Sequence, residues 1–121
     1  MKIMDIQRMQ DIQKELQAKY GEDWIQMAPE NGHYSVLWAI GEVGEMIDVI
    51  KKQGWEAIMN DAQTREDFIK EWVDVMMFMM DITLCYNISP EEITRLYEAK
   101  HAYNLKRWDT EEENQEEENH A

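Results

Sequence analysis

Apolar residues recur at three- and four-residue steps along most of the chain, a spacing that predicts amphipathic helices rather than strands. Four long helices are expected, over residues 2–20, about 33–52, about 65–86 and 90–107. A short helix over residues 55–62 would link the second long helix to the third. The pattern therefore predicts an all-α fold, a bundle of four to five helices.

The two middle helices are the most apolar ones. The helix over residues 33–52 has a wide apolar face, and the helix over residues 65–86 is apolar nearly all round. A helix of the latter kind lies at the centre of its bundle or in a subunit interface. Their glycines Gly41 and Gly44 each cost helix stability, about 1 kcal/mol relative to alanine. We expect another backbone or a ligand to approach closely there, or two helices to pack tightly.

The end of the chain follows a different pattern. Ser89-Pro90-Glu91-Glu92 is a full helix start, with a capping serine, proline at the first helical position and glutamate three residues after the cap. After Trp108 the apolar periodicity stops. We expect one domain over residues 1–108, followed by an acidic, disordered tail over residues 109–121.

The net charge limits the kinds of partner that the protein is expected to bind. The chain has 121 residues, 12 Lys plus Arg and 26 Asp plus Glu, for a formal charge of −14. The tail holds seven of the acids and no Lys or Arg, so residues 1–108 carry −7. An acidic body disfavours binding to a nucleic-acid backbone. Free nucleotides stay possible partners if a metal ion reverses the local charge.

The single cysteine and the short apolar runs indicate where in the cell the protein resides. The single cysteine, Cys85, excludes an internal disulfide and is typical of a reducing environment. The longest apolar run, Val75–Met80, is far shorter than the ~20 residues of a membrane-spanning helix. No signal peptide is recognisable at the start. We therefore expect a soluble cytoplasmic protein that does not bind membranes.

The candidate chemistry lies in two carboxylate pairs inside the apolar helices. Glu42 and Glu45 are three residues apart, and so are Glu71 and Asp74. Residues at this spacing share one side of a helix, so two facing helices would bring four carboxylates together. Such a cluster is costly in an apolar setting unless a cation compensates it. Hard divalent ions, Mg²⁺ above all, prefer these oxygens, although solvated or ion-paired surface acids are the alternative reading.

Further along the chain, candidate substrate-binding groups have a suitable spacing. Lys100, Asn104 and Arg107 follow each other at four and three residues, and cations of this kind suit phosphate oxygens. Trp38 precedes Glu42 by four residues and would stack on a base or pack in the core, and His33 lies at the helix entrance. The chain contains neither GxxxxGK[ST] nor GxGxxG, so a glycine-rich phosphate cradle is excluded.

Taken in order, ExxE, ExxD and K-x-x-x-N-x-x-R resemble the signature of the all-α nucleoside triphosphate pyrophosphohydrolases. This superfamily comprises the MazG-like proteins, dimeric dUTPases and dCTP pyrophosphatases. The resemblance covers roughly residues 30–108 and implies an oligomeric, MazG-like bundle. Many relatives have a Glu-Glu pair where this chain has Gly41-Glu42. Features of both the dCTP pyrophosphatase and the dUTPase branches occur, so the base stays open.

The resemblance also implies an activity. It is Mg²⁺-dependent hydrolysis of a (deoxy)nucleoside triphosphate to the monophosphate and pyrophosphate, with Mn²⁺ as a substitute ion, in nucleotide-pool house-cleaning. Glu42, Glu45, Glu71 and Asp74 would be the metal-binding catalytic residues. The substrate-binding residues would be Lys100, Asn104, Arg107, Trp38 and His33, in a homodimer or homotetramer.

Two other classes compete with this reading. A di-iron carboxylate bundle uses Glu-x-x-His on two helices. Glu98-Ala-Lys-His101 supplies one such motif, and the second, Glu30-Asn-Gly-His33, falls in an expected loop. The other rival is a non-catalytic interaction module that dimerises through its methionine-rich helix and recruits a partner through its acidic tail.

Overall fold

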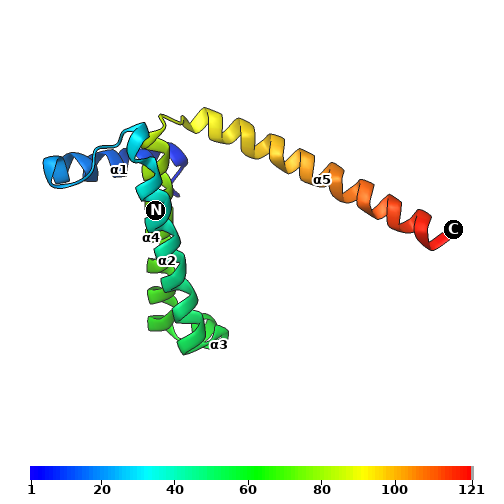
Figure 1. Cartoon of the computed structure of the whole chain (residues 1–121). Helices are drawn as coiled ribbons and strands as arrows, with labels where there is room; N and C mark the ends of the chain where they lie inside the picture. Colours follow the sequence, from blue (N-terminus) through cyan, green and yellow to red (C-terminus); the bar gives the residue numbers. More distant parts are fainter. Residues whose placement is uncertain (121) are drawn as a thin grey trace. The chain divides into compact units, whose positions relative to one another are not determined.

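The computed structural model describes residues 1–120, the last of them by its backbone alone. Helices are the regular elements of this range, joined by short non-helical segments, and it contains no strand. The predicted all-α class is confirmed (Figure 1). The elements, in order, are α1 (Ile6–Tyr20), η1 (Gly21–Asp23), η2 (Pro29–Asn31), α2 (Gly32–Gln53), α3 (Trp55–Asn60), α4 (Ala62–Cys85) and α5 (Pro90–His120). None of the described helices is long and apolar enough to cross a membrane.

The chain divides into two compact units. The first, Met1–Ile88, contains α1 to α4, and the second begins at Ser89 and contains α5. Each unit is described by itself. The predicted domain over residues 1–108 stays a prediction.

The first unit is built on a hairpin of α2 and α4, which lie side by side and run in opposite directions (Figure 1). The hairpin is possible because α2 stops at Gly54, whose φ of 84° is open to glycine at little cost. The third long helix, expected from about residue 65 with Thr64 as its N-cap, begins earlier, because α4 starts at Ala62 and Asp61 is its N-cap. Its carboxylate accepts hydrogen bonds from the Thr64 backbone N–H at 2.9 Å and the Thr64 hydroxyl at 2.8 Å. These bonds lower the pKa of Asp61.

Glutamine side chains hold α1 against α4. The Nε2 of Gln10 donates to Thr83 Oγ1 and to the Ile88 carbonyl, both at 2.9 Å. Gln13 and Gln17 both donate through Nε2 to Asp81 Oδ1, at 2.9 and 3.3 Å. Asp81 is only 4 % exposed, and its burial raises the pKa of its carboxyl while the two amide bonds oppose the rise. A carboxylate thus lies in the interior with amides, and no cation, as hydrogen-bond partners.

This arrangement predicts that Asp81→Asn stabilises the protein at high pH. A raised pKa means that the stabilising, protonated form is lost as pH rises through the folded-state pKa. Asparagine keeps one oxygen as the acceptor for Gln13 Nε2 and Gln17 Nε2, and it carries no buried charge. We expect a gain of about 1–2 kcal/mol in unfolding free energy at pH 8.

Urea unfolding at pH 8 and at pH 4.5 measures the gain, which should be smaller at pH 4.5. The control Asp23→Asn, at an exposed site, should show no gain at either pH. A loss at every pH would contradict the prediction.

The second unit differs from expectation at its end. Its start is the predicted reciprocal cap: the Ser89 N–H donates to Glu92 Oε2 at 2.8 Å, and the Glu92 N–H donates to Ser89 Oγ at 3.1 Å. The predicted end near Arg107 is wrong, because α5 continues to His120. Glutamate is a good helix former, and neither Gly nor Pro follows Pro90 to stop the helix. Arg107 and Glu111 add an i,i+4 pair at 4.0 Å. Ala121, the last residue of the predicted tail, lies outside the described residues.

Candidate metal centre

Three of the four predicted carboxylates come together on the α2–α4 hairpin. They are Glu42, Glu71 and Asp74, and one carboxylate oxygen of each lies within 4.8 Å of those of the other two. Glu42 is in the middle of α2, while Glu71 and Asp74 stand one turn apart on α4. Among the described residues, no other set of three His, Cys, Asp or Glu side chains meets in this way. The Glu-x-x-His motifs at Glu98 and Glu30 therefore assemble no such group.

This triad is a cluster of carboxylates with no positively charged side chain to offset their charge. The pKa of Glu42 is raised, first by desolvation, then by hydrogen bonding with Glu71, and then by the charges of Asp74, Glu71 and Glu45. Removing any of these charges, or adding a cation, would favour the ionised form of Glu42.

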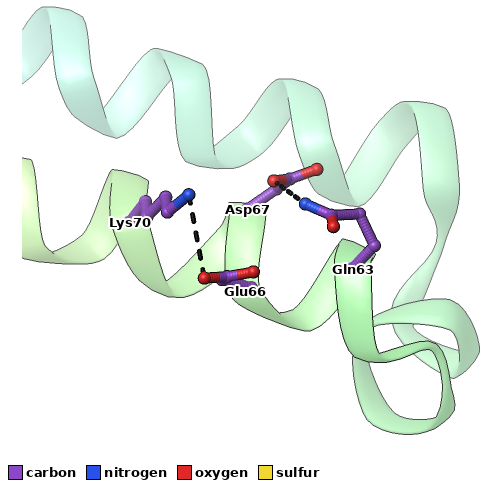
Figure 2. Close-up of polar contacts among 4 residues, drawn as sticks. All are labelled: Gln63, Glu66, Asp67 and Lys70. Carbon is purple, nitrogen blue, oxygen red and sulfur yellow. Dashed lines mark hydrogen bonds and ion pairs between the residues drawn. The ribbon is translucent and has the colours of Figure 1, made fainter.

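Lys70, the nearest lysine in sequence, is paired elsewhere. Its Nζ lies 3.8 Å from Glu66 Oε1, on an exposed part of α4, as Figure 2 shows. Beside it, Gln63 Nε2 donates to Asp67 Oδ1 at 2.9 Å (Figure 2). Among the described side chains, ion pairs form only at Lys70–Glu66 and Arg107–Glu111. The triad is thus left without a basic partner, which is the condition that a bound cation would relieve.

Glu45 stands outside the triad in this structure. It is exposed, and it lines a neighbouring hollow together with Asp48, Lys52 and Thr64, between the end of α2 and the start of α4. Its charge still reaches Glu42, whose pKa it helps to raise. Glu45 as a fourth ligand stays a prediction.

The glycines that flank Glu42 have free space around them. A methyl group built on Gly41 or Gly44 would meet no atom of the chain within 4 Å. The expected close approach of a helix or backbone is therefore absent within the described residues.

Trp38 lies in an aromatic cluster next to the triad. Its ring centroid is 5.1 Å from that of Trp24, 5.9 Å from that of Tyr34 and 5.9 Å from that of Phe78. The side chain is half-buried, so the structure gives it a packing role and leaves part of its surface open. His33 is exposed, and the centroid of its ring lies 4.1 Å from that of the Tyr34 ring.

The predicted phosphate-binding residues belong to the second unit. On α5, Lys100 and Arg107 both lie near the Tyr103 ring: its centroid is 5.3 Å from Lys100 Nζ and 5.9 Å from Arg107 Cζ. Asn104 and Arg107 line a shallow hollow with His101. All are exposed, and they form one cationic face of the helix as the spacing predicts.

Sequence reasoning missed the buried polar groups of the first unit. Gln13 is 2 % exposed and Ser35 is 1 % exposed, and an oxygen of each has no hydrogen-bond partner among the described residues. The signal was present for α1, because Gln10, Gln13 and Gln17 recur at the spacing of a buried helix face.

Comparison of the chain with protein-family models, curated proteins and solved structures gives no significant match. The resemblance to the pyrophosphohydrolases therefore rests on the sequence motifs alone.

Proposed function

We propose that this protein is a Mg²⁺-dependent nucleoside triphosphate pyrophosphohydrolase that removes surplus or non-standard nucleotides in the cytoplasm. The observation that carries the proposal is the convergence of Glu42, Glu71 and Asp74 to within 4.8 Å without a basic partner. Three oxygen donors at this separation suit one hard divalent cation, and Mg²⁺ bound by few carboxylates keeps coordination positions for water and phosphate oxygens.

In this proposal Glu42, Glu71 and Asp74 hold the ion, and Glu45 is the fourth carboxylate. Mg²⁺ supplies Lewis acidity toward the phosphate oxygens and the attacking water. Glu42 binds the ion only in its ionised form, so its raised pKa makes proton and cation compete for one side chain.

The substrate's remaining charge requires separate groups. Lys100 and Arg107 neutralise the leaving pyrophosphate, and Asn104 hydrogen-bonds to the substrate through its amide. Trp38 offers its open surface to the base, and His33 lies five residues earlier on the same helix, α2.

The test is a panel of common and modified nucleoside triphosphates incubated with the purified full chain. We expect at least one to yield the monophosphate and pyrophosphate in equal amounts with Mg²⁺ and neither product with EDTA. Release of orthophosphate would show that a different phosphoanhydride bond of the substrate is cleaved. Absence of turnover across the panel, with no Mg²⁺ binding by calorimetry, would overturn the proposal.

A further inference from the structure

A cavity of about 240 Å³ lies between α1 and α4 in the first unit. Most of its wall consists of methionines, namely Met4, Met9, Met76, Met77 and Met80. Ile12 of α1 and Trp72 and Val73 of α4 complete the apolar part of the wall. The cavity is open to solvent on one side, where Trp72, Val73 and Met77 are 49, 37 and 38 % exposed.

Among the described residues that line the cavity, Gln13 is the only polar one. Its Nε2 donates to Asp81 Oδ1 at 2.9 Å, and Gln17 Nε2 donates to the same oxygen. Since Asp81 Oδ1 accepts from Gln17, the atom of Gln13 that meets it must also be a donor, which fixes the orientation of the Gln13 amide. The Oε1 of Gln13 is therefore a buried acceptor without a hydrogen-bond partner among the described residues.

This acceptor is costly to bury unless something donates to it. A water molecule is a poor candidate, because a buried water typically needs roughly two to four polar partners and this wall offers one. A small organic molecule with a single N–H or O–H group needs only that one acceptor, and the rest of its surface would meet apolar side chains. The cavity therefore suits a mainly apolar molecule that carries one hydrogen-bond donor.

The size and the wall of the cavity narrow the class of molecule further. An apolar cavity of roughly 150 Å³ holds one benzene ring, so 240 Å³ suits one ring or two fused rings. Methionine sulfurs make favourable contacts with aromatic rings, and Trp72 adds an aromatic ring to the wall. Methionine side chains are also flexible, so they can shift to uncover Gln13 Oε1 and to fit the shape of a ligand. These features favour an aromatic ligand over an aliphatic one.

We infer that the cavity between α1 and α4 binds a small aromatic molecule, of the class of indoles and phenols, that donates one hydrogen bond to Gln13 Oε1. None of the residues that line the cavity is a candidate metal ligand. The inference does not rest on the proposed hydrolysis.

The experiment compares the binding of indole, benzofuran and cyclooctanol to the full chain, in titrations followed by NMR of the ligand. Indole and benzofuran have nearly the same shape, but benzofuran has an oxygen in place of the N–H group. Indole should bind saturably, with a Kd of about 1 mM or tighter, and benzofuran at least about 10-fold more weakly. Cyclooctanol has a donor but no aromatic ring, and it should also bind at least about 10-fold more weakly than indole.

Two leucine variants test the role of Gln13. Gln13→Leu removes the acceptor and should abolish the preference for indole over benzofuran. Gln17→Leu is the matched control, because it removes the other amide bond to Asp81 and lies outside the cavity. It should keep the preference.

Two phenylalanine variants test the location and cover the case in which Gln13→Leu does not fold. Val73→Phe fills the cavity and should abolish indole binding, whereas Ile69→Phe, one turn earlier on α4 and outside the cavity, should not. Absence of saturable indole binding to the wild-type chain, or equally tight binding of either analogue, would overturn the inference. A preference for indole that persists in Gln13→Leu, or indole binding that Val73→Phe leaves unchanged, would overturn it as well.

Discussion

Glu71→Gln is expected to lower Mg²⁺-dependent pyrophosphate release by at least about 100-fold, since it replaces a charged ligand by a neutral one. Glu71 occupies a special place in the triad because it both hydrogen-bonds with Glu42 and raises its pKa through its charge. Glutamine keeps the shape of the side chain and one oxygen, so the loss would report charge rather than packing. Initial rates at saturating Mg²⁺, over a range of nucleotide concentrations, measure the effect.

The matched control is Glu66→Gln, the same substitution on the same helix at an exposed residue that pairs with Lys70. It should retain full turnover. Thermal melting provides a readout independent of catalysis: at 100 times its Kd, Mg²⁺ should stabilise the wild-type chain by about 2.7 kcal/mol, and Glu71→Gln should lose most of this gain. Without Mg²⁺ the variant should melt no lower than the wild type, because one repulsive charge is gone. Unchanged turnover together with an unchanged Mg²⁺ effect would remove Glu71 from the ligand set.

Trp38→Ala is expected to lower the free energy of unfolding by about 2–3 kcal/mol, somewhat less than for a fully buried tryptophan. The indole packs against the rings of Trp24, Tyr34 and Phe78, and truncation would leave all three without their common neighbour. Urea unfolding followed by circular dichroism measures the loss. A cost below about 0.5 kcal/mol would show that the cluster does not depend on this side chain.

Trp38→Phe separates packing from substrate contact. Phenylalanine keeps an aromatic ring in the cluster, so most of the stability should remain. If the indole also stacks on the base, KM for the preferred nucleotide should rise several-fold while kcat changes little. An unchanged KM would leave Trp38 with its packing role alone.

Periodicity was sufficient to predict the helices that build the site. The i,i+3 spacing of Glu71 and Asp74 on an apolar helix already implied that both carboxylates share one side, and the structure places them so. Pairing them with Glu42 required α2 to run antiparallel to α4, which the short connection through Gly54 and α3 makes the natural arrangement.

Other features depend on details that periodicity does not contain. Glu42 and Glu45 are equivalent in the sequence pattern, but a small rotation of α2 decides which of them faces α4. The sequence pattern places the start of this helix at Thr64, a good capping residue, but Asp61 lies three positions earlier and caps α4 by accepting two hydrogen bonds from Thr64. Loss of apolar periodicity after Trp108 predicted a helix end near Arg107, whereas glutamate needs no buried face to continue a helix, and α5 runs on to His120.

The amide contacts of α1 have a consequence for the alignment of this helix along α4. Gln10 donates to Thr83 Oγ1 and to the Ile88 carbonyl, and a slide of one helical turn would take it away from both acceptors, whereas Gln13 and Gln17, one turn apart, already share Asp81 Oδ1. Methionines, by contrast, adapt to a shifted neighbour. The two hydrogen bonds of Gln10 therefore favour one lengthwise position of α1 on α4, which adaptable apolar contacts alone would leave open.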